Sequence, residues 1–161
     1  MPPEYHWELQ NTAADNGYLF DDREKFRMFK FEDDVYNLYQ FKTRAFELKD
    51  DTIYIFVLSP ANELYVLPSK IVSENKNIHH SSFLNGGPVL AAGEFDIKGA
   101  QIIWSNASGH YRPHYECLKH ILTYFTINGM KHADIKDWIC IESITQEPID
   151  SAPSCVKQFQ N

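Results

Sequence analysis

Two short polar segments carry the residue types that could do chemistry in this chain. HHSSFLNGG begins at His79, and SNASGHYRP begins at Ser105. An imidazole can give or take a proton near neutral pH, and a serine hydroxyl becomes a nucleophile when a base lies within reach. Arginine can hold two phosphate oxygens at once, and a helix with Pro113 in its first turn would offer free N–H groups to an anion. This set of groups suits a reaction at a phosphate ester or anhydride.

The catalytic roles of this hypothesis fall on a few side chains. His110 would be the general acid or base, and Ser81 would hold or polarise a phosphate. The side chains expected to bind substrate are His80, Ser82, Ser108, Tyr111, Arg112 and His114.

Each of these residues also has a plain structural interpretation. Ser108 could shape the loop before a helix, and His110 could be a hydrogen-bonded turn histidine. Tyr111 could belong to the core, and Arg112 could pair with surface carboxylates. Both interpretations stay open at this point.

The elements that position the two segments are strands. The run TIYIFVLS at 52–59 predicts a central, doubly buried strand, and ELYVL at 63–67 predicts its return partner. Residues 89–97 and 100–104 predict a hairpin, because Lys98-Gly99 supplies a turn between them. Antiparallel pairing sets the start of the first of these strands beside the end of the second. The two polar segments should therefore meet at one end of the sheet.

The remaining elements complete an α+β fold, a mostly antiparallel sheet with one long helix at about 113–128 packed across it. We interpret 25–41 as an aromatic hairpin, 68–77 as a loop and 137–144 as a final strand. A strand that begins VLAAG has an unusually slim first half, which suits close approach by another backbone or a ligand. We expect a single domain over 1–161, in which 1–22 and 145–161 are extended or partly ordered ends.

Composition excludes several classes of protein. The chain has 161 residues, enough for one core, and a net charge of −7 that argues against a general nucleic-acid binder. Its three cysteines lack CxxC spacing, which favours reduced thiols in a cytosol-like compartment. We expect a soluble protein with no signal-peptide layout and no membrane contact; secretion into a host cell without a cleavable signal is compatible with this.

The sequence lacks the common nucleotide-binding and metal-binding motifs. The glycines at 86 and 87 lack the pattern of a P-loop or a dinucleotide fingerprint. His110 and His114 are four apart, but Pro113 interrupts the turn between them and no carboxylate completes a ligand set. We therefore predict no metal held by these side chains.

The order IFVLS, LYVL, HSSFLNGG, AAG, IW, SGHYRP resembles the core domain of the plant IQ-motif-containing (IQM) calmodulin-binding proteins. The resemblance runs from the EYHW region to about residue 144, and the HSSF and SGHYxP blocks are its specific part. The same paired blocks are similar to domains of bacterial secreted toxins and effectors. An IQ motif needs Ile/Leu-Gln followed by spaced arginines, and this sequence has none, so the resemblance does not imply calmodulin binding.

A second resemblance implies a reaction. Some bacterial effectors transfer AMP from ATP with a serine followed at a distance by His-x-x-x-Glu, and Ser81 and His110 match the first two of these residues. His114 stands where the glutamate would be, so Glu116 or Glu94 would have to substitute. ATP and Mg²⁺ are the cofactors that this hypothesis requires.

Three function hypotheses follow, and whether the chain is an enzyme stays open. The first is a nucleotidyltransferase of the effector or toxin type that acts on a host or target protein. The second is a metal-independent RNase-like toxin with His80 and His110 as the acid–base pair and Arg112 on the phosphorane. The third is a non-catalytic protein-binding module related to the plant core. In that module the slim strand or the basic-aromatic stretch REKFRMFKF would meet the partner.

Overall fold

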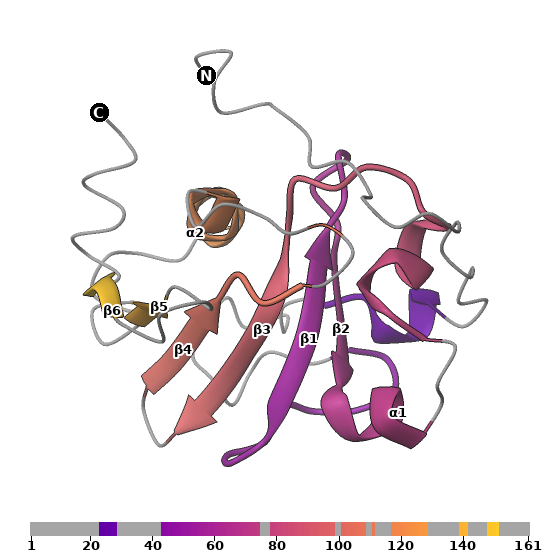
Figure 1. Cartoon of the computed structure of the whole chain (residues 1–161), viewed down its shortest axis with the longest axis horizontal. Helices are drawn as coiled ribbons and strands as arrows, with labels where there is room; N and C mark the ends of the chain where they lie inside the picture. The colour runs from indigo at the N-terminus through magenta and orange to yellow at the C-terminus, as the bar shows by residue number, and fades with distance from the viewer. Residues whose placement is uncertain are drawn as a thin grey trace.

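The fold is a mixed six-stranded sheet with helical segments packed on both faces (Figure 1). The computed structural model describes residues 23–28, 43–74, 78–98, 101–108, 111, 117–128, 139–141 and 148–151. Its elements in chain order are η2 (Arg23–Phe26), β1 (Ile53–Leu58), β2 (Leu64–Pro68), α1 (Ser69–Glu74), η4 (His80–Leu84), β3 (Ala91–Lys98), β4 (Gln101–Ser105), α2 (Leu118–Ile127), β5 (Ile139–Ile141) and β6 (Pro148–Ser151), where η marks a 3₁₀ helix. This arrangement confirms the α+β fold class.

Strand order in the sheet is β2-β1-β3-β4-β5-β6. The pairs from β2 to β4 are antiparallel, and β3 and β4 form the expected hairpin with Phe95 opposite Trp104. The pair of β4 and β5 is parallel, and β6 then returns antiparallel to β5. β1 and β3 are therefore the inner strands of the part of the sheet that carries the two polar segments.

Side chains that alternate along the strands divide the core into two clusters. One face carries Tyr54, Phe56 and Trp104, and α2 packs against it through residues that include Phe125. Ring centroids lie 4.7 Å apart between Phe95 and Trp104 and 5.9 Å apart between Trp104 and Phe125, so aromatic contacts join the helix to the sheet.

The opposite face is covered by η4 and α1. Ile55, Val57 and Ala92 point to this face, and they pack with Phe83 of η4 and with Tyr111 from the second polar segment. Figure 1 shows α2 on one side of the sheet and α1 on the other. The first polar segment is therefore part of a core layer.

Some of the elements expected from the sequence differ in the structure, and others lie partly outside the described residues. The interval 68–77, expected as a loop, contains α1, because Ile71 and Val72 can pack against the sheet from one short helical turn. Lys25 and Phe26 lie in η2 rather than in a strand, and the rest of the expected hairpin, 29–41, lies outside the described residues. β5 confirms a strand within 137–144, and β6 lies inside 145–161.

The helix expected at about 113–128 is α2, which begins at Leu118 and is followed by Asn128 as its C-cap. Residues 112–116 lie outside the described part of the chain. Both Cys117 and Leu118 are fully buried at the first turn, so the helix enters the core from its start.

The slim half of β3 admits another backbone, as the sequence predicts. A side-chain carbon at Gly93 would overlap the carbonyl group of Ser105 and lie 3.1 Å from the Cα of Asn106. Both neighbouring atoms belong to backbone and cannot rotate away. The end of β4 therefore requires glycine at position 93.

Gly93→Ala should lower the free energy of unfolding by about 3 kcal/mol or more, since the added methyl group forces two paired strands apart. Urea denaturation measures the loss. Gly87→Ala is the matched control, because its added carbon would lie 3.0 Å from the carbonyl oxygen of Leu84, a milder contact, and should cost about 1 kcal/mol. Equal losses in the two variants would contradict the close approach at Gly93.

Candidate functional site

The HSSF block forms η4, in which His80 binds the helix to the sheet and the serines bond at its two ends. The Nε2 of His80 lies 2.7 Å from the carbonyl oxygen of Gly93, and because a carbonyl only accepts, Nε2 carries the hydrogen and donates. The Oγ of Ser82 accepts a 2.9 Å hydrogen bond from the backbone N–H of His79. Ser81 is fully buried, and its carbonyl accepts the N–H of Gly86 at 2.8 Å.

Tyr111 of the SGHYxP block joins the same layer. Its hydroxyl donates a 2.6 Å hydrogen bond to the carbonyl oxygen of Gly87, and its ring is buried beside Phe83. Burial raises the pKa of Tyr111 to about 12, so the hydroxyl stays protonated and acts as a donor at neutral pH. The Oγ of Ser108 lies 3.5 Å from the N–H of Tyr111 as an acceptor.

These contacts confirm that the two polar segments meet at one end of the sheet. Ser81 has no surface open to solvent in this fold, so its hydroxyl is not accessible to a phosphate. The described groups of the blocks thus connect η4 to β3 and Tyr111 to the loop after η4. Of the side chains expected to act on substrate, His110, Arg112, His114 and Glu116 lie outside the described residues, and their roles stay predictions.

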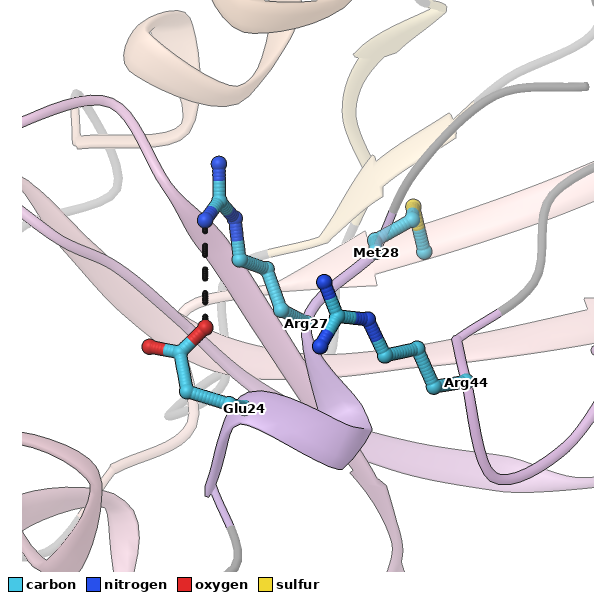
Figure 2. Close-up of a pocket in the computed structure, with 4 residues that line it drawn as sticks. All are labelled: Glu24, Arg27, Met28 and Arg44. Atoms are coloured by element: carbon cyan, nitrogen blue, oxygen red, sulfur yellow. Dashed lines mark ion pairs between the residues drawn. The ribbon is translucent and has the colours of Figure 1, made fainter.

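An open hollow of about 330 Å³ lies elsewhere, beside η2 (Figure 2). Glu24, Arg27, Met28 and Arg44 line it, and Figure 2 shows the Arg44 side chain extending toward Arg27. We call it the η2 hollow. Its described lining residues combine two guanidinium groups, one carboxylate and a thioether, which suit a polar ligand with a short apolar stem.

Backbone contacts fix the two walls of the η2 hollow. Arg27 forms an isolated antiparallel bridge with Tyr65 of β2, and the N–H of Met28 donates to the carbonyl of Leu64 at 2.8 Å. The N–H of Ala45 donates to the carbonyl of Lys25 at 3.0 Å, which ties the 43–48 segment to η2. The edge of β2 therefore carries η2, and η2 carries the segment that bears Arg44.

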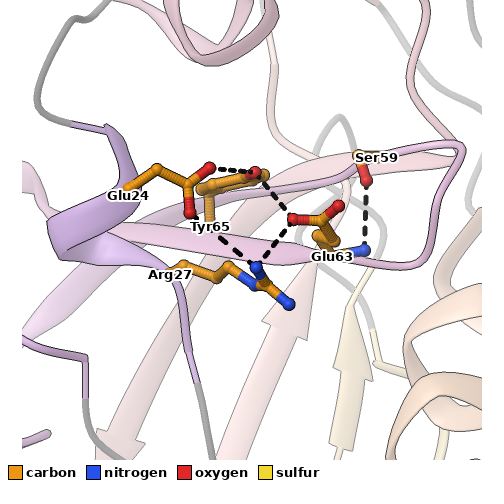
Figure 3. Close-up of polar contacts among 5 residues, drawn as sticks. All are labelled: Glu24, Arg27, Ser59, Glu63 and Tyr65. Carbon is orange, nitrogen blue, oxygen red and sulfur yellow. Dashed lines mark hydrogen bonds and ion pairs between the residues drawn. The ribbon is translucent and has the colours of Figure 1, made fainter.

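A polar network anchors Arg27 to the sheet (Figure 3). The Tyr65 hydroxyl lies 3.1 Å from an oxygen of Glu24 and 3.1 Å from an oxygen of Glu63. Arg27 lies 3.1 Å from Glu63 and 3.8 Å from Glu24. The N–H of Glu63 also donates to the Oγ of Ser59 at 3.0 Å.

Tyr65 has one hydroxyl hydrogen for two carboxylates, so Arg27 supplies the positive charge that lets both approach it. Burial raises the pKa of Tyr65 well above its usual range, and the hydrogen bonds and negative charges of Glu63 and Glu24 raise it further. The phenol therefore stays neutral, and the network depends on the guanidinium of Arg27.

The sequence indicated only part of the lining of the η2 hollow. REKFRMFKF gave the basic-aromatic stretch that contributes Glu24, Arg27 and Met28. Arg44 carried no local signal, because its segment meets these residues through contacts between distant parts of the chain, the Ala45–Lys25 hydrogen bond and the packing of Phe46 against Phe26. A hydrophobic-periodicity analysis cannot predict such a contact.

Comparison with known protein families identifies the family to which the chain belongs. Residues 22–118 match the family model described as the IQ motif-containing protein middle domain, IQM_M, which is more than half of the chain. This chain belongs to that family. The matched residues include η2, the first four strands and both specific blocks, so the IQM middle domain contains the η2 hollow as well as the layer formed by η4.

Two Arabidopsis thaliana proteins are similar to this IQM middle domain. The IQ domain-containing protein IQM2 is 35% identical over 85 residues, which are 52% of this chain and 13% of that protein. The IQ domain-containing protein IQM3 is 37% identical over 82 residues, 50% of this chain and 17% of that protein. The matches thus cover a small part of each relative's length. No solved structure matches the chain.

The family supports the resemblance to plant IQM proteins and lends nothing to the toxin, effector or nucleotidyltransferase hypotheses. Within the described residues, no group of three or more His, Cys, Asp or Glu side chains could hold a metal ion. In the same part of the chain, no helix is both long and apolar enough to span a bilayer.

Glu94 follows Gly93 in β3 and lies beside a second hollow on the sheet. It lies opposite Ser105 in the β3–β4 pair and lines this hollow of about 240 Å³ with Ile53, Asp96 and Ile103 among others. Burial raises the pKa of the Glu94 carboxyl above its ordinary value. The charged form is therefore partly desolvated in the folded state.

Glu94→Gln should raise the melting temperature at pH 7. A raised pKa means that the folded state binds the proton more tightly than the unfolded chain, so stability falls as pH rises through the folded pKa. The gain should vanish below about pH 4, where the carboxyl is protonated in both states. Thermal melts across this pH range test the sign. Asp96→Asn is the control, since it removes the 3.6 Å ion pair with Lys98 and should give no rise.

Tyr111→Phe should lower the free energy of unfolding by about 1 to 2 kcal/mol, because the Gly87 carbonyl loses its 2.6 Å donor while the ring still packs. Chemical denaturation measures the loss. Unchanged stability would mean that the hydroxyl is available for a substrate, as the catalytic hypotheses expect.

Proposed function

We propose that this chain is a non-catalytic protein-binding module that meets its partner at the η2 hollow. One observation carries the proposal. The side chains of His80, Ser82 and Tyr111 in the HSSF and SGHYxP blocks hydrogen-bond to backbone atoms, whereas the charged groups of the η2 hollow line an open space. A site that recognises another molecule needs accessible groups, and the η2 hollow provides them.

The binding surface differs from the slim strand that the sequence suggested. β1 pairs with β3 along Ala91–Gly93, whereas β4 pairs only with Glu94–Lys98. On the β4 side the Gly93 carbonyl already accepts from His80, and the backbone of Ser105 and Asn106 approaches Gly93 closely, which leaves little room for an added peptide strand. η2 instead lies against the edge of β2, and the accessible arginine side chains beside it are those of Arg27 and Arg44 (Figure 2). The partner therefore meets side chains rather than a free sheet edge.

Phosphate chemistry has weaker support among the described residues. Ser81 is buried, and the Nε2 of His80 already donates to Gly93. The resemblance that suggested AMP transfer depends on His110 and on a carboxylate after it, and the family found here is the plant one. The RNase-like hypothesis also depends on His80 and His110, and the net charge of −7 opposes it.

A binding experiment with matched variants tests the proposal. The purified chain is immobilised and exposed to cell extract, retained proteins are identified by mass spectrometry, and each is bound again in purified form. The double variant Arg27→Gln/Arg44→Gln should lose the retained partner, and His110→Ala should keep it. Lys70→Gln/Lys98→Gln is the control, because it removes the same charge from two exposed side chains outside the η2 hollow.

Two outcomes would overturn the proposal. In the first, the double arginine variant retains the partner and His110→Ala loses it with an unchanged melting temperature. In the second, the wild-type chain transfers AMP from ATP with Mg²⁺, or cleaves RNA, and His110→Ala abolishes that activity. Either result would return the function to the SGHYxP block.

A further inference from the structure

We propose that the η2 hollow binds a carboxylate side chain of an acidic peptide, with Arg44 as the anchoring cation. The inference rests on the proposed function and adds the chemistry of the partner. It depends on which charges of the hollow are already compensated and which are not.

Arg44 carries a positive charge that no other described residue of the hollow neutralises. Its side chain is exposed, and none of the described carboxylates forms an ion pair with it. The guanidinium presents donors in a planar fork, which matches the two oxygens of a carboxylate. A carboxylate that entered the hollow could therefore bind it in a bidentate manner.

Glu24 does not compete for this position. One of its oxygens accepts from the Tyr65 hydroxyl at 3.1 Å, and the other lies 3.8 Å from Arg27. Both oxygens are thus turned toward the β2 side of the network (Figure 3). Among the described lining residues, the hollow offers a cation on one wall and an engaged carboxylate on the other, a combination that favours an anion.

Arg27 can contribute a second contact. Its Nη1 makes both ion pairs. The exposed fractions of the three side chains are 48% for Arg27, 52% for Glu24 and 31% for Glu63. Because both ion pairs use Nη1 alone, they can persist while another nitrogen of the guanidinium binds a ligand. Arg27 can therefore keep its place on the sheet and still donate to an incoming carboxylate through its other nitrogens.

The floor of the hollow suits the stem of an acidic side chain. Met28 lines the hollow and is otherwise packed in the core, with 4% of its surface exposed. Its flexible thioether can pack against methylene groups. A glutamate side chain would rest its methylenes there and direct its carboxylate to Arg44.

A carboxylate is favoured over a phosphate by the charge of the whole chain. A phosphomonoester carries about −1.5 to −2 charge at neutral pH, whereas a carboxylate carries one. The chain has a net charge of −7, so long-range repulsion opposes the dianion more strongly.

Fluorescence anisotropy with short labelled peptides tests the inference. The probes are a Glu/Gly peptide, its Gln/Gly isostere, a Lys/Gly peptide and a phosphoserine/Gly peptide, each titrated with the full chain. The Glu/Gly peptide should bind best, and its affinity should weaken as salt is added. Arg44→Gln should weaken it by about tenfold or more, as expected for the loss of a charge-assisted bidentate contact.

Two variants keep the result interpretable. Lys70→Gln removes one exposed positive charge from α1 and should leave the affinity unchanged. Arg44→Lys keeps the charge but not the fork, and it should fall between the wild type and Arg44→Gln. An unchanged melting temperature for each variant shows that the fold is retained.

The inference is overturned if the Gln/Gly peptide binds as well as the Glu/Gly peptide, or if Arg44→Gln has no effect. Tighter binding of the phosphoserine peptide would also overturn it and would make phosphate the ligand. Preference for the Lys/Gly peptide would end the inference but leave the binding module intact. If no peptide binds but partner capture still depends on Arg27 and Arg44, the inference is likewise overturned and the binding module stays intact.

Discussion

The absence of a side chain at Gly93 allows three parts of the domain to come together. On one side of this residue, the backbone of Ser105 and Asn106 fills the space that a Cβ would need. Its carbonyl oxygen accepts the hydrogen bond from His80, which fixes η4 to the middle of the sheet. Because β3 pairs with β1 and β4 at once, a shift at this point would move both neighbours and the layer above them.

This constraint changes how the two specific blocks are understood. Histidine, serine and tyrosine together suggest catalysis when their positions are known only from sequence. In the fold, His80 and Tyr111 donate to backbone carbonyls, and Ser82 accepts from a backbone N–H. Buried carbonyls and amides that lie outside regular pairing need such partners. The same residue types that serve an active site therefore also serve to close a buried loop.

The sequence predicted the strands well because their signals are local. The run around Phe56 is apolar on both faces, as a central strand requires, and Lys98-Gly99 marked the turn of the hairpin. α1 was missed since one helical turn has too few residues to show a period. The η2 hollow depends on a bridge from Arg27 to Tyr65, and contacts between residues so far apart in the chain leave no local pattern.

The anchoring of Arg27 explains why a charged surface can lie beside a buried edge strand. Tyr65 is buried in β2, and its hydroxyl meets the partly exposed carboxylates of Glu24 and Glu63. Two negative charges at one phenol would repel each other without a cation between them, and Arg27 provides that cation at 3.1 Å from Glu63. Because this compensation uses Arg27 locally, Arg44 is left as the charge that an outside molecule can satisfy. In the proposed binding module, the charge balance inside the domain therefore selects an anionic partner.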